Sequence, residues 1–224
     1  MKAAPDPRAV RDASLDELRR LGLPLPPPSF PLVWEPGDGV ELRPTAEIEA
    51  RAAVLHVVVA SCFGLSTEAA MGWLLKSQLV DFVTPPEWQF VAVDRGDHRS
   101  FVMHHDAVFA LAWLLGLCDH LDPTAPPEGL MTRMPDLPGG ELFNEWRSRS
   151  LAAPRQAGDA AVLLDLYYCL DWAFQEAERT GARLPGEVDS NAVGQRRWAL
   201  EWAVTFTGPY HDDPPEWEEV DLSV

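Results

Sequence analysis

Hydrophobic residues recur at helical spacing through most of the chain. The longest such runs are "RPTAEIEARAAVLHVVVASCFG" (43–64), "SFVMHHDAVFALAWLLGLCDHLD" (100–122), "DAAVLLDLYYCLDWAFQEAERTG" (159–181) and "NAVGQRRWALEWAVTFTG" (191–208). No run alternates convincingly between apolar and polar residues, which is the pattern of a half-buried strand. The pattern predicts an all-α fold, a single globular helical domain of about seven helices.

Capping residues mark where several of these helices are expected to begin and end. Ser14 and Glu17 have the spacing of a capping box, and Gly22 supplies the stop. Thr84 and Glu87 form a second box, with a proline at the first helical position. Further N-caps are expected at Thr45, Ser100, Asp159 and Asp213.

The predicted domain spans residues 1–224 and has three parts. Residues 1–44 hold an N-terminal helix and a proline-rich strap, "LPLPPPSFP"; residues 45–207 form the helical core; residues 208–224 are an acidic C-terminal tail. The stretch "QFVAVDRGDHRSFVM" fits a second interpretation, because it could turn back on itself at Arg95–Asp97. An α+β fold with a small hairpin near residues 89–103 is therefore the alternative.

Charge and composition narrow the function classes. The chain has 224 residues, 46% of them hydrophobic, and a net charge of −17. Such a charge repels nucleic acid and anionic membranes and favours a basic partner. The N-terminus lacks the apolar stretch of a signal peptide, and the apolar runs are too short and interrupted to span a bilayer. Three cysteines far apart in apolar surroundings predict reduced thiols in a soluble, cytoplasmic protein.

The histidines of residues 100–122 raise the question of a metal site. If residues 101–120 form one helix, His104 and His120 lie about 24 Å apart and cannot share an ion. Neighbouring side chains such as His104, His105 and Asp106 diverge around a helix, and neither histidine has a ligand one turn away. The negative charge of Asp106 suits the first turn of such a helix, and His120 suits its last turn. We therefore predict no metal, and no motif predicts a cofactor.

Asp165 is the most unusual polar position. The exposed stripe of its helix is expected to contain Asp171, Gln175 and Glu178, and Asp165 lies about 120° from that stripe. A half-buried carboxylate needs a hydrogen-bonding or cationic partner. Asp165 is therefore either a catalytic or ligand-binding acid, or half of a structural ion pair, for example with Arg196 or Arg197 of the last helix.

The C-terminal tail offers the best localised candidate for partner binding. Residues 211–221, "HDDPPEWEEVD", hold six carboxylates around one of the chain's nine tryptophans. The two prolines limit the freedom of the segment, the acids would steer a basic partner, and the ring would supply affinity. The predicted partner-binding residues are Trp217, Asp212, Asp213, Glu216, Glu218 and Glu219. In the alternative, Trp217 folds back onto the protein's own core and the acids form a solvated rim.

The order of several motifs resembles a bacterial family of proteins, domain of unknown function 4272. The resemblance covers most of residues 8–222 and rests on "RDASLDELRRLGLPLPP", "RPTAEIEARAAVL", "HHDAVFALAWLLGLCDHL", "DLYYCLDWAFQEAERTGARLP" and "GQRRWALEWAV…PEWEEVDL". On the last helix, Arg196, Ala199, Leu200 and Trp202 match the family pattern, whereas Gln195, Arg197 and Glu201 depart from it. The family has no established activity, so the resemblance implies a single domain and no particular chemistry.

Two function hypotheses remain. The first is a non-catalytic interaction protein that binds a basic macromolecule, as an immunity protein, an antitoxin-like protein or a regulator would. The second is an enzyme whose site is assembled from scattered residues, with Asp165, Arg196, Arg197 and Glu201 as candidates. The sequence has no Gly-rich phosphate loop, no Gly-x-Ser-x-Gly elbow and no His-Glu-x-x-His motif, and this favours the first hypothesis.

Overall fold

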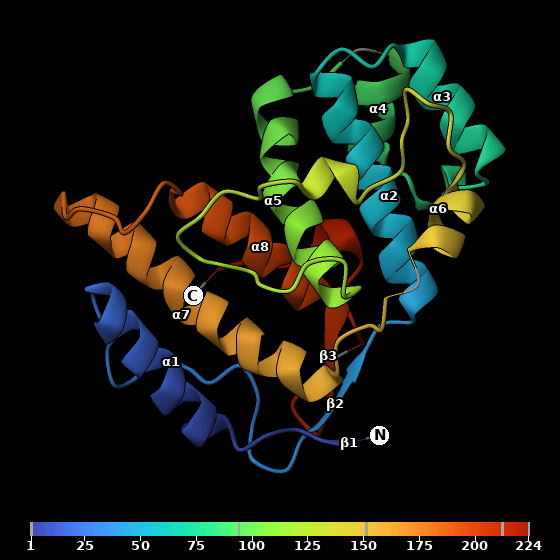
Figure 1. Cartoon of the computed structure of the whole chain (residues 1–224). Helices are drawn as coiled ribbons and strands as arrows, with labels where there is room; N and C mark the ends of the chain where they lie inside the picture. The colour runs from blue at the N-terminus through green and yellow to red at the C-terminus, as the bar shows by residue number, and fades with distance from the viewer. Residues whose placement is uncertain (1, 94, 151, 212, 224) are drawn as a thin grey trace. The chain divides into compact units, whose positions relative to one another are not determined.

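The computed structural model describes residues 2–93, 95–150, 152–211 and 213–223. Within these residues the chain forms eight α-helices, three short strands and three 3-10 helices (Figure 1). The predicted helical character is confirmed, and the small sheet was not anticipated. The chain divides into a terminal unit (Met1–Arg43, Leu121–Pro126 and Arg155–Val224) and a central unit (Pro44–His120 and Pro127–Pro154). The single domain over residues 1–224 stays a prediction.

The terminal unit is built around one long helix. Its elements are β1 (Lys2–Ala3), α1 (Pro7–Leu21), β2 (Gly39–Leu42), α7 (Ala157–Thr180), α8 (Ser190–Ala203), β3 (Val204–Thr207) and the 3-10 helix η3 (Trp217–Glu219). Helix α7 packs against both α1 and α8 (Figure 1). Leu18, Tyr167, Phe174 and Leu200 lie in the resulting core with essentially no exposed surface.

The sheet of this unit is antiparallel, with the strand order β1-β2-β3. Val40 pairs with Phe206, whose ring stacks on the buried Trp34 at a centroid distance of 5.1 Å. The expectation that the last helix continues to Gly208 is therefore wrong. Two β-branched residues and a phenylalanine follow Ala203, and these suit a strand that can pair with β2.

Several helix starts differ from the expected caps. Helix α1 begins well before Ser14, because the side chain of Asp6 accepts a hydrogen bond from the Arg8 amide and a proline occupies the first helical position. Ser14 is thus a buried residue inside the helix. Gly22, with φ 72°, ends α1 as expected. Helix α7 begins at Ala157, ahead of Asp159. In the tail, Glu216 rather than Asp213 precedes the short helical turn.

The central unit is mostly helical. It contains α2 (Thr45–Cys62), α3 (Thr67–Lys76), η1 (Val80–Phe82), α4 (Pro85–Val93), α5 (His98–Leu114), η2 (Leu130–Thr132) and α6 (Phe143–Arg149). Helix α2 is buried along most of its length and packs against α5 (Figure 1). Only half of the expected Thr84–Glu87 box forms at the start of α4. The Thr84 amide donates to Glu87, 2.9 Å away, whereas the Thr84 hydroxyl is buried without a hydrogen-bond partner among the described residues. The other Glu87 oxygen accepts a hydrogen bond from Arg51, in a pair that is almost fully buried.

Residues 89–103 hold the end of α4 and the start of α5, so the alternative of a hairpin there is wrong over the part that the structure describes. Asp97, not Ser100, caps α5 by accepting from the Arg99 amide. The helix ends at Leu114, well short of residue 120, and Asp106 lies in its interior rather than in its first turn. Gly116, with φ 74°, makes the turn, and a side chain there would clash with the backbone of Ala153.

None of the helices within the described residues combines the length and the hydrophobicity that crossing a bilayer demands.

His56 is a buried polar residue in the middle of α2. Its Nε2 lies 3.0 Å from the carbonyl oxygen of Pro135, and its Nδ1 is buried without a hydrogen-bond partner among the described residues. A carbonyl oxygen only accepts hydrogen bonds, so Nε2 must carry the proton. Burial lowers the pKa of His56 to about 4, although the contact with Pro135 opposes the change. The imidazole is therefore neutral at pH 7.

The lowered pKa of His56 predicts acid sensitivity. The unfolded chain binds a proton at His56 from about pH 6.5 downward, whereas the folded chain binds it only near pH 4. Above about pH 6.5 both states leave His56 neutral, so its titration costs no stability there. Between about pH 6.5 and pH 4 only the unfolded chain gains the proton, and the free energy of unfolding should fall by about 3 kcal/mol. Urea unfolding at several pH values should therefore show a shallower acid loss in His56→Gln than in the wild type. Parallel curves would contradict this assignment.

Candidate functional site

The terminal unit contains a pocket of about 460 Å³ between its helices and its tail. Leu164 and Tyr168 of α7 and Arg197 and Glu201 of α8 line it from the helices. Residues 32–33, β3 and the C-terminal tail line its other sides. Two of the four enzyme candidates, Arg197 and Glu201, therefore lie at this pocket, whereas Asp165 and Arg196 are not among its lining residues.

Among the described residues of that lining, Arg197 is the only basic residue other than a histidine, and its charge is shared between two carboxylates. Its Nε donates to Glu201 over 2.6 Å and its Nη1 to Asp171 over 2.7 Å. The guanidinium also lies over the ring of Tyr168, 4.6 Å from the centroid. Asp171 was expected on the exposed stripe of its helix, but only 2% of its surface is exposed. The helical phase placed it wrongly because α8 covers that side of α7.

Glu201 has an electrostatically unfavourable position for a carboxylate. Burial raises its pKa, and the nearby Asp171 and Asp221 add to the rise, while Arg197 opposes it. Arg197 faces two carboxylates, those of Glu201 and Asp171. When both are ionised, the three side chains together carry a net negative charge. A further cation near Glu201 would therefore favour its ionised form.

The tail is fastened to the unit along its length. His211 lies 2.7 Å from a carboxylate oxygen of Asp38, and the carbonyl oxygen of Pro215 accepts a hydrogen bond from Arg43. Two further carbonyl oxygens accept from α8: that of Trp217 from the indole of Trp198, and that of Leu222 from Arg197 at 3.1 Å. The tail is thus a wall of the pocket.

Trp217 lies in the protein's own core, with 3% of its surface exposed. Its ring stacks on Trp198 at 5.6 Å and meets Trp202 edge-on at 5.4 Å. This is the alternative in which the ring folds back, and it leaves Trp217 as an internal anchor rather than an exposed one. Three aromatic rings in contact bury a large apolar area, which explains why the short tail holds its place.

The acidic residues of the tail divide into two groups. Asp213 and Glu219 line the pocket, together with Asp221. Asp221 is not one of the predicted partner-binding residues. Glu216 and Glu218 are exposed and are not among the lining residues. Asp212 lies outside the described residues. The pocket therefore brings together four carboxylates, from α8 and the tail, and a single guanidinium.

Asp165 is almost fully buried and has a basic partner, but not on α8. Arg11 of α1 donates to it through Nη2 at 2.8 Å and through Nε at 3.1 Å, and the hydroxyl of Ser14 donates at 2.7 Å. The suggested partners Arg196 and Arg197 are therefore wrong. Arg11 also donates to the carbonyl oxygens of Phe30 and Pro31 in the proline-rich strap. The contacts of Asp165 are those of a structural ion pair.

Arg196 is also held by internal contacts. It is completely buried, and it donates to the carbonyl oxygens of Asp122 at 2.5 Å and Ala125 at 3.0 Å. A buried guanidinium that donates to two main-chain oxygens stabilises the segment that carries them.

The residues that the structure describes contain no group of three or more histidine, cysteine or acidic side chains placed to hold a metal ion. The absence of a metal or a cofactor stays a prediction. The prediction of no metal assumed one helix over residues 101–120. Helix α5 ends before residue 120, so His120 lies beyond it and that geometry no longer applies.

Comparison with known proteins gives one match. The model of a protein family described as a domain of unknown function, DUF4272, matches residues 11–220. The chain belongs to this family. No curated protein and no solved structure matches the chain. The residues of α8 that carry the DUF4272 resemblance, Arg196, Ala199, Leu200 and Trp202, are all buried, so this part of the family pattern describes packing.

Sequence reasoning missed several residues of the pocket. Tyr168 reads as one more apolar position of α7, and Leu164 likewise, so neither stands out from the core. Asp221 was visible as one of the six acids of the tail, and its position beyond Trp217 was the available signal. Arg11 and Ser14 lie three residues apart and so share a face of α1, which is a signal that could have found the partners of Asp165.

The buried pair predicts a large effect of Asp165→Ala. Removing the carboxylate leaves Arg11 charged and buried, so the free energy of unfolding should fall by about 3–5 kcal/mol. The control is Asp16→Ala on the same helix as Arg11, where the ion pair with Arg19 is exposed and the change should be within about 0.5 kcal/mol. Equal unfolding curves for the two variants would show that Asp165 is solvated.

The stacked tryptophans predict a second stability effect. Trp217→Ala should lower the free energy of unfolding by about 3–5 kcal/mol, because it leaves a cavity beside Trp198 and Trp202. Tyr210→Ala, in the same tail but 82% exposed, should change it by less than about 0.5 kcal/mol. Denaturant unfolding followed by tryptophan fluorescence and by circular dichroism measures both. A tail that detaches without loss of global stability would contradict the anchoring role.

Proposed function

We propose that this protein is a soluble, non-catalytic binding protein that takes a cationic side chain, lysine or arginine, of a basic macromolecular partner into the pocket of the terminal unit. The observation that carries the proposal is the charge of that pocket. Four carboxylates of the described residues line it, and the one guanidinium among them is already bonded to Glu201 and Asp171. A cation entering the pocket relieves this imbalance, whereas an anion would increase it.

The shape of the pocket supports the same ligand. Leu32, Val33, Leu164 and Val204 provide apolar contacts that suit the aliphatic part of a lysine or arginine side chain. The exposed Asp213, Glu219 and Asp221 are placed to receive its charged end. The acids steer the encounter, and the net charge of −17 adds to the attraction at longer range.

The enzyme hypothesis has less support. Asp165 and Arg196 are engaged in internal contacts, and the pocket holds only Arg197 and Glu201 of the four candidates. An antitoxin-like, immunity or regulatory role remains the proposed context. The acidic charge disfavours nucleic acid and anionic membranes as partners, and three free thiols, Cys62, Cys118 and Cys169, are consistent with the proposed cytoplasmic location.

The test is a comparison of short labelled peptides. One carries an arginine between apolar residues, and the other has citrulline at that position, which keeps the shape and removes the charge. Fluorescence anisotropy should show about tenfold weaker binding of the citrulline peptide, the value of one or two charge-assisted hydrogen bonds. Affinity for the arginine peptide should also fall as the pH falls through the titration of Glu201, whose pKa is raised by burial.

Matched variants separate the effect of the pocket carboxylates on peptide binding from the effect of the net charge of the protein. Asp213→Asn/Glu219→Gln/Asp221→Asn should abolish the preference for arginine over citrulline. Asp12→Asn/Asp16→Asn/Glu187→Gln changes the net charge equally at exposed positions outside the pocket lining and should keep that preference. If both triple variants behave alike, the pocket does not recognise the cation and the proposal fails.

A further inference from the structure

Strand β3 borders the pocket of the terminal unit and lies at an edge of the sheet. The strand order β1-β2-β3 leaves one side of β3 without a neighbouring strand among the described residues. Val204, Thr205 and Phe206 are consecutive, so their side chains point alternately to opposite faces of the sheet, yet all three line the pocket. Because β2 occupies the other side of the strand, the pocket adjoins the free edge of β3.

A hydrogen bond just beyond the paired residues shows which main-chain groups face that edge. The Arg43 amide donates to the carbonyl oxygen of Ala203 at 2.9 Å, one position beyond the Leu42–Val204 pair. Opposed residues of an antiparallel pair are alternately hydrogen-bonded and not hydrogen-bonded to each other. Residues 203, 205 and 207 therefore direct their main-chain groups towards β2, whereas 204 and 206 direct theirs away from it.

Three main-chain groups at this edge are left for a partner. The Val204 amide donates to the Leu200 carbonyl oxygen at the end of α8. The carbonyl oxygen of Val204 and both the N–H and the C=O of Phe206 have no hydrogen-bond partner among the described residues. Pro214 and Pro215 of the tail line the same pocket but have no N–H to donate to these oxygens. Such an edge is a template for a further strand.

We propose that the partner presents its lysine or arginine on an extended segment, which pairs with the free edge of β3 as a fourth strand of the sheet. This inference rests on the proposed function, and it adds the conformation of the partner. Main-chain hydrogen bonds to Val204 and Phe206 supply affinity for any extended segment. The carboxylates of the pocket select a segment with a basic side chain.

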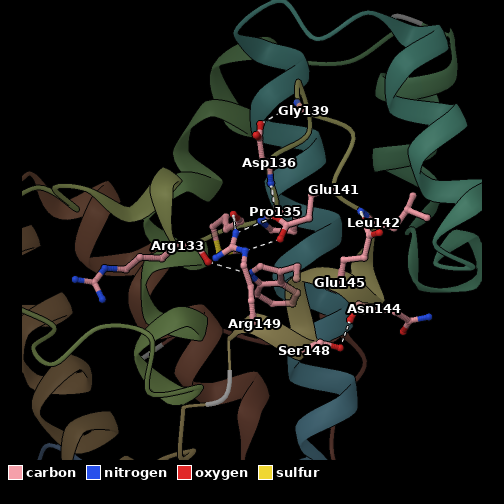
Figure 2. Close-up of polar contacts among 12 residues, drawn as sticks. Arg133, Pro135, Asp136, Gly139, Glu141, Leu142, Asn144, Glu145, Ser148 and Arg149 are labelled. Carbon is pink, nitrogen blue, oxygen red and sulfur yellow. Dashed lines mark hydrogen bonds and ion pairs between the residues drawn. The ribbon is translucent and has the colours of Figure 1, made fainter.

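The pocket of the central unit offers neither feature. It has a volume of about 950 Å³ and mostly apolar walls, with His56 and His105 among its lining residues. Within the described lining, one carboxylate, Asp136, balances one guanidinium, that of Arg149. Figure 2 shows that Arg149 is in addition bonded to Glu141. No described residue of this unit lies in a strand, so a basic segment has no edge to extend there.

The test uses the labelled arginine peptide and singly N-methylated forms of it. An N-methyl group removes one amide donor of the peptide. The edge of β3 offers two acceptors, the oxygens of Val204 and Phe206, so two peptide amides that lie two residues apart should pair with it. N-methylation at either of these positions should weaken binding about fivefold in fluorescence anisotropy, and N-methylation between them should leave the affinity unchanged.

The outcomes separate this inference from the proposed function. A preference for arginine over citrulline, with equal effects of N-methylation at all positions or at none, overturns strand addition and leaves the cation pocket standing. Loss of the arginine preference overturns both. Phe63→Ala changes the wall of the pocket in the central unit and should leave the affinity of the peptide unchanged. Loss of binding in that variant places the peptide elsewhere and overturns the proposal.

Hydrogen exchange, followed by NMR on the full-length protein, measures the pairing at β3 itself. The Phe206 amide has no acceptor in the free protein and should exchange rapidly, whereas the Thr205 amide is directed at β2 and is already protected. Saturation with the arginine peptide should slow exchange at Phe206 by about tenfold or more and leave Thr205 unchanged. Equal exchange at Phe206 with and without bound peptide overturns the proposal.

Discussion

Asp165 and Asp171 are both buried on α7, and each is bonded to an arginine of a different helix. A carboxylate in such surroundings is tolerated only with a cation and further hydrogen bonds. Arg11 therefore fixes α1 against one part of α7, and Arg197 fixes α8 against another. Arg11 also binds two carbonyl oxygens of the proline-rich strap, and Arg197 binds one of the tail. The strap, the tail and both neighbouring helices thus depend on two acidic positions of one helix.

These dependences explain what could be read from the sequence. Helical spacing and caps such as Gly22 are local, and they predicted the helical character and several boundaries correctly. The strand after Ala203 was missed because its partner, β2, is far away in the chain. Asp171 was misplaced for the same reason: helical phase says which residues share a face, but only the packing of α8 decides whether that face is exposed.

The candidate site was predictable to a similar degree. Glu201, Arg197 and the acids of the tail stood out as charged residues, and the structure brings several of them together. The apolar half of the pocket could not be predicted, because Leu164 and Tyr168 differ in no visible way from core residues. The same holds for the pocket of the central unit, where the informative residue is His56, an imidazole inside an apolar helix whose environment only the fold reveals.

The tail is attached mainly through its main chain, since the oxygens of Pro215, Trp217 and Leu222 make the contacts. Apart from the Trp217 ring and the contact of His211 with Asp38, the attachment requires no particular side chain. The side chains at 213, 219 and 221 are instead part of the pocket lining. The contacts that attach the tail are therefore separate from the side chains that line the pocket. Related chains can thus carry other residues at 213, 219 and 221, and so bind other ligands, while the backbone of the tail stays in the same position.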